Sequence, residues 1–318
     1  MTGVRVAAFG LTSWDELLFT DRHPAPGDYA IVHRAVEQPG GTTANLAVAL
    51  ARLGVHVSLA AMVGDDAEGR RLREELAAAG VDIRHVRTRA SEPTDRSTII
   101  VAGEGAAADR TIVWRRGARL RRGDHLPIEE FFAYDLVVVD VDDPRLRRLI
   151  VDLSMHVSPR TRLLGPLVYL TTLDPATGLD LALRHDYVVG NATELCYLTG
   201  APDLPAALAV LREEMILSQT RLAAITCGAD GCVLVDRDRV VTVPAFDVEV
   251  VDPTGAGDAF AAGLALGIVS RWDLAQIGRF ANAMGALATR CPGAQAGLPR
   301  RGEVERFLAA APVREPVR

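Results

Sequence analysis

The most informative segment of the chain is Val251–Gly267, which reads VDPTGAGDAFAAGLALG. A glycine-bearing turn precedes a run of small apolar residues, which predicts a strand that ends at about Val251 and a helix that begins near Ala256. Gly255 and Gly257 allow the backbone to approach a ligand closely, with free N–H groups at the positive end of the helix dipole. Such a turn suits an anion such as a phosphoryl group.

Asp258 lies in the first turn of the predicted helix. A carboxylate at this position is stabilised by the dipole, and it can accept a proton from an attacking hydroxyl. The alternative is that Asp258 only stabilises its own helix. A dinucleotide site is disfavoured, because the pattern G-x-G-x-x-G would need glycine where Phe260 stands. A redox enzyme is therefore the weakest hypothesis.

Outward from this segment, apolar strands alternate with helices. Each strand is apolar on both faces, which indicates a parallel sheet covered on both sides. Two stretches, about 12–38 and 97–114, break this rhythm and predict a small separate β-sheet. No linker-like run divides the chain, so we expect one domain over 1–318. The predicted strands are 4–10, 57–63, 135–141, 187–189 and 222–226, and the predicted helices include 42–54 and 66–80.

The composition excludes several classes of function. A net charge of −6 argues against a nucleic-acid partner, and no apolar run is long enough to cross a membrane. The first residues lack the features of a signal peptide, so we expect a cytoplasmic protein. All 35 basic residues are arginine, which excludes a lysine Schiff base and a Walker A lysine. Phosphate chemistry must then use backbone N–H groups, helix dipoles, arginine or metal.

Two further segments carry polar residues that could bind a ligand, one at a loop before a helix N-terminus and one after the first predicted strand. In QPGGTTAN (Gln38–Asn45), the glycines permit close backbone approach and the asparagine can bind a polyhydroxylated ligand. Alternatively, Thr42 or Thr43 caps the helix that follows. Asp15 comes after the first strand, where open α/β sheets place ligand-binding residues, although an exposed turn aspartate fits the sequence equally well.

Three further sets of residues leave two interpretations open. Asn191 and Glu194 in GNATE could orient water around Mg²⁺, or they could cap a helix. Asp140 and Asp142 could bind a hydroxyl or form an Asx turn. The cluster RRGARLRRG (115–123) holds five arginines. It could be a solvated loop, or Arg115, Arg116 or Arg119 could contact a phosphorylated substrate.

Together these segments resemble the PfkB, or ribokinase-like, carbohydrate kinases, from about residue 4 to residue 308. GGTTAN with LAVALARLG resembles the N-terminal signature, and DPTGAGDAFAAGLALG the C-terminal one. NATE resembles the N-x-x-E element, and TCGADG (226–231) the nucleotide-site turn. The resemblance implies a three-layer α/β/α fold with a mostly parallel central sheet. It also implies a small β-sheet lid, formed by 12–38 and 97–114, that in many members pairs subunits into a homodimer.

The resemblance implies an ATP-dependent sugar kinase that transfers the γ-phosphoryl group of Mg-ATP to a hydroxyl of a small carbohydrate or sugar derivative. Asp258 would be the catalytic base. The anion hole would be formed by Gly255, Ala256 and Gly257. The sugar hydroxyls would be held by Asp15, Gly40, Gly41 and Asn45. The nucleotide and its Mg²⁺ would lie near Asn191, Glu194, Thr226, Gly228 and Asn282.

Two details of metal binding follow from the same resemblance. Glu194 would act on Mg²⁺ through water, and Asp252 falls in a region that in some members binds a monovalent cation such as K⁺. The substrate is less well indicated, because Ser13, Thr42 and Thr43 replace residues common in the family. One alternative is a nucleoside kinase of the same fold, with Trp14, Phe19 and Tyr29 as candidate base contacts. Another is a non-catalytic relative that binds sugar or nucleotide.

Overall fold

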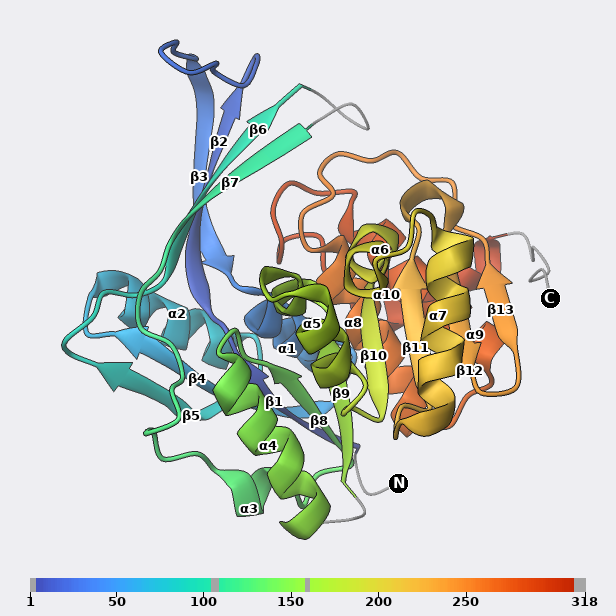
Figure 1. Ribbon diagram of the computed structural model, residues 1–318. Helices are drawn as coiled ribbons and strands as arrows, with labels where there is room; N and C mark the ends of the chain where they lie inside the picture. Colours follow the sequence, from blue (N-terminus) through green and yellow to red (C-terminus); the bar gives the residue numbers. More distant parts are fainter. Residues whose placement is uncertain (1–3, 104–108, 158–160, 312–318) are drawn as a thin grey trace.

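The computed structural model describes residues 4–103, 109–157 and 161–311. Its centre is a nine-stranded sheet with the order β13-β12-β11-β10-β9-β8-β1-β4-β5 (Figure 1). In this spatial order, β11, β10, β9, β8, β1, β4 and β5 all run parallel to one another. At the other edge β12 runs antiparallel to β11, and β13 runs antiparallel to β12. These strands are β1 (Arg5–Gly10), β4 (His56–Gly64), β5 (Asp82–Arg89), β8 (Leu136–Asp140), β9 (Arg162–Pro166), β10 (Tyr187–Asn191), β11 (Leu222–Thr226), β12 (Cys232–Asp236) and β13 (Val240–Val243).

Helices cover both faces of the sheet because successive strand residues point to opposite sides. In β1, Val6 and Ala8 join one buried cluster, and Ala7 and Phe9 join another. The first face carries α1 (Thr42–Arg52), α2 (Ala67–Ala78), α8 (Ala256–Val269), α9 (Leu274–Ala288) and α10 (Arg301–Ala310). The second carries α3 (Ile128–Phe131), α4 (Pro144–Val157), α5 (Pro175–Ala182), α6 (Ala192–Thr199), α7 (Leu204–Leu217) and the 3₁₀ helix η2 (Val168–Thr172). The three-layer prediction is confirmed.

A four-stranded sheet projects from the body beside the central sheet (Figure 1). Its order is β3-β2-β6-β7, and its own small apolar cluster contains Leu17, Ile99 and Val101. These strands are β2 (Ser13–Thr20), β3 (Val32–Gly40), β6 (Arg96–Ala102) and β7 (Asp109–Arg115). They fall in the two predicted stretches, so the predicted lid is confirmed. Among the described residues, we find no helix with the length and apolarity that a membrane crossing requires.

The strand predicted to end at about Val251 is absent, and this prediction was wrong. The last strand, β13, ends at Val243, and residues 244–250 form no regular element. Pro244 has no N–H to donate to a sheet. The segment is held by side-chain packing instead, because Phe246 packs against Phe307 with ring centroids 5.0 Å apart. The segment therefore crosses the helices of the first face before α8 begins.

Candidate active site

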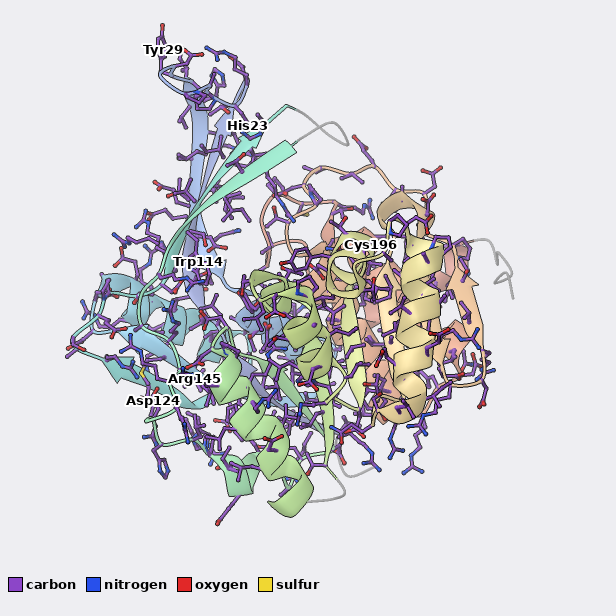
Figure 2. All side chains as sticks on the ribbon, in the orientation of Figure 1. His23, Tyr29, Trp114, Asp124, Arg145 and Cys196 are labelled. Atoms are coloured by element: carbon purple, nitrogen blue, oxygen red, sulfur yellow. The ribbon has the colours of Figure 1, made fainter. Side chains whose placement is uncertain are left out.

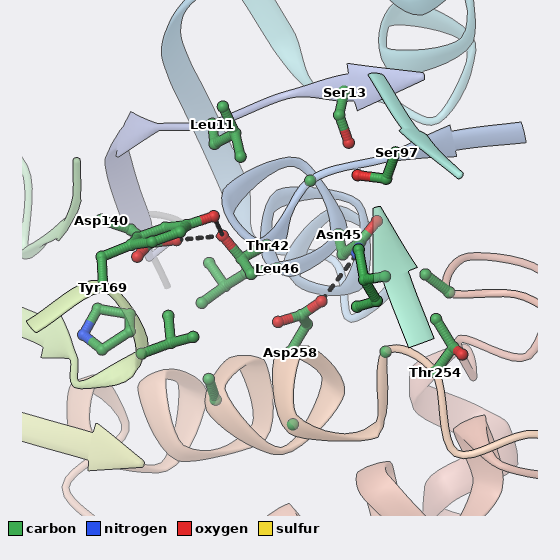
Figure 3. Close-up of a pocket in the computed structure, with 18 of the residues that line it drawn as sticks. Leu11, Ser13, Thr42, Asn45, Leu46, Ser97, Asp140, Tyr169, Thr254 and Asp258 are labelled. Atoms are coloured by element: carbon green, nitrogen blue, oxygen red, sulfur yellow. Dashed lines mark hydrogen bonds between the residues drawn. The ribbon is translucent and has the colours of Figure 1, made fainter. Parts of the chain in front are cut away.

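A cavity of about 410 Å³ opens at the carboxyl ends of the parallel strands (Figure 3). Strands β1, β8, β9, β10 and β11 end beside it, and the N-termini of α1 and α8 point into it. The lid strands β2, β6 and β7 supply the opposite wall. Ligands in open α/β sheets bind at this edge. Nine of the predicted residues line the cavity: Asp15, Gly41, Asn45, Asn191, Glu194, Thr226, Gly255, Gly257 and Asp258.

The turn before α8 requires glycine. Gly255 is the N-cap residue and has φ +81°, a left-handed conformation that costs other residues free energy. A Cβ at this position would lie 2.5 Å from the carbonyl oxygen of Ala294. The N-cap makes no side-chain bond to the helix. The Ala256 N–H donates to the carbonyl of Pro253 at 3.2 Å, so it is the N–H groups after Ala256 that need another acceptor. They are thus available to an anion in the cavity.

Asp258 follows this turn, with its carboxylate in the cavity (Figure 3). Burial raises the pKa of Asp258 to about 7, and the carboxylates of Asp140 and Asp15 act in the same direction. Hydrogen bonding opposes this shift, because Asn45 Nδ2 donates to Asp258 Oδ2 at 2.8 Å. Gln295 Nε2 donates in turn to Asn45 Oδ1 at 2.9 Å. Asn45 therefore orients the Asp258 carboxylate, and Gln295 fixes the orientation of the Asn45 amide.

Asp15 lies on the lid strand β2, across the cavity from α8. Ser13 Oγ donates to Asp15 Oδ1 at 2.7 Å, and Ser97 on β6 also bonds the carboxylate. Burial raises the pKa of Asp15 to about 6 despite these bonds. Gly40 does not line the cavity, but a Cβ there would lie 1.9 Å from Asp15 Oδ2. The glycine predicted to contact the sugar thus makes room for the carboxylate that does line the cavity.

A buried polar network supports the floor of the cavity. Asp140 Oδ2 accepts hydrogen bonds from Thr42 Oγ1 at 2.5 Å and from Thr43 Oγ1 at 2.8 Å. The threonines therefore do not cap α1, since its N-cap is Gly41 with no side-chain bond. The Tyr169 hydroxyl lies 3.4 Å from Thr42 Oγ1 (Figure 3). Burial raises the pKa of Tyr169 well above its usual value, so the phenol stays neutral.

Arg147 holds Asp140 from the side away from the threonines. Its Nη2 lies 3.8 Å from Asp140 Oδ1, and the two side chains are 1% and 2% exposed. Its Nε donates to the carbonyl of Val141 at 3.2 Å, and its Nη1 to that of Pro166 at 3.1 Å. Neither Asp140 Oδ1 nor Arg147 Nη2 has a hydrogen-bond partner. Both atoms are buried from solvent, so the ion pair fixes the orientation of the Asp140 carboxylate and does not present Oδ1 to the cavity.

Asn191 and Glu194 both cap a helix and line the cavity. The Asn191 side chain accepts from the Glu194 N–H at 2.8 Å, and Glu194 Oε2 accepts from the Asn191 N–H at 3.0 Å. Glu194 Oε1 accepts from Asn191 Nδ2 at 2.9 Å. Burial raises the pKa of Glu194. Thr226 ends β11 beside them, so these three residues form one wall of the cavity.

Three other predicted residues do not line the cavity. Ala256 is the first residue of α8, and Gly228 begins the 3₁₀ helix η3 (Gly228–Asp230) just after Thr226. Asn282 Nδ2 donates to the carbonyls of Val243 at 3.0 Å and Pro244 at 3.1 Å, which holds the end of β13. The nucleotide contacts predicted for Gly228 and Asn282 stay predictions.

Asp252 is buried, and both of its oxygens accept backbone N–H groups. Oδ1 accepts from Thr254 at 2.9 Å, and Oδ2 accepts from Gly293 at 2.7 Å. These bonds join the turn before α8 to the segment after α9. No group of three or more His, Cys, Asp or Glu side chains arranged to hold a metal occurs in the described part of the chain.

The aromatic candidates differ from those that the sequence indicates. Trp14 packs in the core beneath the guanidinium of Arg71, and Tyr29 is 76% exposed at the far end of the lid (Figure 2). Neither lines the cavity, and nor does Phe19. Trp114 and Tyr169 line it instead, with ring centroids 6.1 Å apart. Trp114 belongs to the lid and Tyr169 to the body, so only the folded chain brings them together.

The arginine cluster also lies outside the cavity. Arg119 pairs with Asp142 at 3.5 Å, and Arg116 stacks over the Trp114 ring at 4.5 Å. Arg115, Arg116 and Arg119 are absent from the cavity lining. The arginine that does line it is Arg110, in the lid segment, which no sequence motif marks.

The chain resembles kinases over almost its entire length. Residues 4–301 match the model of the pfkB family carbohydrate kinase. Ribokinase of Bacillus subtilis is 30% identical over 318 residues, covering 96% of this chain and 99% of that protein. An ATP-dependent ribose-1-phosphate kinase of Halopiger xanaduensis is 30% identical and covers 96% of this chain and 98% of its own length.

The solved structure of Arabidopsis thaliana ribokinase, complexed with ribose and ATP, has a TM-score of 0.82 at 22% identity. The match covers 97% of this chain and 99% of the Arabidopsis chain, so the fold is ribokinase-like throughout. The chain belongs to the pfkB family of carbohydrate kinases, ATP-binding phosphotransferases with an alcohol group as acceptor.

Proposed function

We propose that this protein transfers the γ-phosphoryl group of ATP to a hydroxyl of a small sugar or sugar derivative, with Asp258 as the base. One observation carries the proposal: the Asp258 carboxylate lies in the cavity one turn from the uncapped N-terminus of α8. A hydroxyl beside Asp258 would therefore meet a phosphoryl group held by the N–H groups that follow Gly255.

The proposed step needs positioning more than covalent chemistry. The acceptor hydroxyl gives its proton to Asp258, and its oxygen forms a bond to the γ-phosphorus. The bond from that phosphorus to the bridging oxygen breaks, and ADP leaves with the electron pair. Asn45 keeps the carboxylate pointed at the hydroxyl through its 2.8 Å bond. The N–H groups at Gly255 and Gly257 stabilise the charge on the phosphoryl oxygens, while that of Ala256 donates to the carbonyl of Pro253.

Magnesium fits the wall that Asn191 and Glu194 form. Mg²⁺ prefers oxygen ligands and keeps several of its waters, so it is usually held by one or two carboxylates together with substrate phosphates. Glu194 accepts one hydrogen bond at each oxygen, which leaves each a lone pair for a metal-bound water. When bound, Mg²⁺ neutralises negative charge on the phosphates of ATP. A monovalent cation beside Asp252 stays a prediction.

The acceptor would lie between Asp15 on the lid and Asp258 on α8. Asp15 and Asn45 offer hydrogen bonds to more than one hydroxyl of the same ligand, as a sugar requires. A nucleoside is the second candidate, because Trp114 and Tyr169 give the cavity an aromatic wall. The ribose hydroxyls of a nucleoside would use the same carboxylates.

A coupled assay of ADP release with Mg-ATP tests the proposal. The acceptors are ketoses, aldoses, sugar acids, sugar phosphates, polyols and nucleosides, each compared with a blank that lacks acceptor. We expect turnover with a neutral sugar or a nucleoside well above the blank. Folded protein that binds ATP and phosphorylates none of these acceptors would contradict the proposal.

The activity should depend on pH through Asp258. Because burial raises the pKa of Asp258 to about 7, the base is protonated at lower pH and cannot accept a proton. We expect kcat/KM for the acceptor to rise with pH and to level off above about pH 7. Asn45→Ala should move the midpoint to higher pH, because the amide that favours the charged carboxylate is lost. A rate independent of pH between about 5 and 8 would contradict the assignment.

We also propose that two copies of the chain pair through the lid. Tyr29, Ile31, Val32 and Val113 are large apolar residues of the lid that the single chain leaves exposed. Burying them against a second copy would remove apolar surface from water. We expect sedimentation to give the mass of a dimer, and Ile31→Glu to shift it towards the monomer. A monomeric wild-type chain at micromolar concentration would rule out this pairing.

A further inference from the structure

Arg110 connects the lid to the turn at which the proposed phosphoryl transfer occurs. It lies on the lid strand β7, and its side chain lines the cavity. Arg110 Nη1 donates to Thr254 Oγ1 at 3.2 Å. Thr254 directly precedes Gly255, the N-cap residue of α8. The guanidinium therefore lies beside the turn whose N–H groups face the cavity.

The described cavity lining carries several carboxylates and one arginine, Arg110. The lining includes the carboxylates Asp15, Asp140, Glu194 and Asp258, all of which repel the negative charge of a phosphoryl group that passes between ATP and the acceptor. Arg110 is the only cationic side chain among the described lining residues. The chain contains no lysine that could replace it. Arg110 also acts on Asp258 electrostatically, since its positive charge lowers the pKa that burial raises.

We propose that Arg110 binds the phosphoryl group while that group passes from ATP to the acceptor. The inference rests on the proposed function. A guanidinium is planar and presents paired N–H donors that match two oxygens of one phosphoryl group. The N–H groups of α8 approach that group from the body of the protein and Arg110 approaches it from the lid. The negative charge on the phosphoryl oxygens is then neutralised from two sides.

The phosphoryl oxygens in question could come from two sources. One is the group in transfer, and the other is a phosphate that the acceptor already carries. The bond to Thr254 places Arg110 at the anion-binding turn and near Asp258, where the transferred group must pass. We therefore assign Arg110 to the transferred group, and the experiment separates the two.

The variants are Arg110→Gln, Arg110→Lys and a matched control, Arg34→Gln. Arg34 is an exposed lid residue on β3 whose guanidinium lies over Phe19 at 3.9 Å, outside the cavity lining. We expect Arg110→Gln to lower kcat about 100-fold, the scale of losing one charge-stabilising donor. Its dissociation constant for ATP, measured by calorimetry, should change less than about threefold, because only the transition state is affected. Arg110→Lys should recover part of the rate, since it keeps the charge without the paired donors.

A second measurement needs no acceptor turnover. Aluminium fluoride with ADP imitates the phosphoryl group in transfer, so it should tighten ADP binding to the wild-type chain and to Arg34→Gln. In Arg110→Gln, the gain in ADP affinity that aluminium fluoride produces should be at least about tenfold smaller than in the wild type. An equal gain in Arg110→Gln, or a kcat close to that of the wild type, would overturn the proposal.

The two sources give different kinetics. If Arg110→Gln raises KM only for phosphorylated acceptors and leaves kcat for neutral acceptors unchanged, Arg110 binds the acceptor's own phosphate and the proposal is wrong. If the wild-type chain phosphorylates no acceptor, the proposed function fails. The aluminium fluoride measurement then still decides the role of Arg110.

Discussion

Asp258→Asn should lower kcat about 1,000-fold, within the range that general base catalysis contributes. The substitution keeps the size of the side chain but removes its ability to take a proton. The new amide can still accept the hydrogen bond that Asn45 Nδ2 now gives to the carboxylate at 2.8 Å. The geometry of the turn is therefore retained, and the loss reports the chemistry. The measurement is steady-state turnover with saturating Mg-ATP and acceptor.

Asp238→Asn is the matched control, because Asp238 is an exposed residue of the turn between β12 and β13 and does not line the cavity. We expect the control to retain wild-type turnover. Binding of ATP to Asp258→Asn, followed by calorimetry, should remain within about threefold of the wild type. The pH dependence that Asp258 imposes should disappear together with the rate. A kcat reduced less than about tenfold would show that another group takes the proton.

Arg147→Met should destabilise the protein by about 3–5 kcal/mol, the usual cost of leaving a buried charge without its partner. The side chains of Arg147 and Asp140 are 1% and 2% exposed, and Arg147 Nη2 lies 3.8 Å from Asp140 Oδ1. Methionine fills a similar volume, so packing changes little. The stability would be lost because Asp140 loses its charged partner and the carbonyls of Val141 and Pro166 lose their hydrogen-bond donor. The free energy of unfolding in urea measures the effect.

Arg148→Met provides the control at the adjacent position. Arg148 pairs with Asp180 at 2.9 Å, but its side chain is 48% exposed, so the loss should stay below about 1 kcal/mol. The double variant Asp140→Asn with Arg147→Met should recover part of the stability, because no buried charge then remains unpaired. Equal losses for the Arg147 and Arg148 variants would show that the buried pair contributes nothing.

The sequence predicts the parts of this protein that depend on local patterns. The turn at Gly255, the helix after it and the capping pair of Asn191 and Glu194 are each set by residues a few positions apart. The lid was predictable because its two stretches break the alternation of strand and helix. The strand predicted to end at about Val251 failed for the same reason, since a local pattern cannot reveal whether a partner strand exists.

The remaining features of the site depend on pairs that are distant in the sequence. Asn45 and Asp258 are 213 residues apart, and Arg110 and Thr254 are 144 apart. Nothing near Arg147 shows that its side chain is buried against Asp140. Trp114 and Tyr169 form one aromatic wall only because the lid lies over the carboxyl ends of the strands. Such residues can be recognised in the folded structure but not from a sequence motif.

One carboxylate of the site belongs to the lid and another to the body. Asp15 lies on β2, which begins at Ser13 after β1 has ended at Gly10, whereas Asp258 lies on α8. An acceptor bound as proposed would contact both parts of the molecule at once. Water is too small to span them, so it would gain nothing from the lid and would compete poorly for the phosphoryl group. A site divided in this way between lid and body would protect ATP from wasteful hydrolysis.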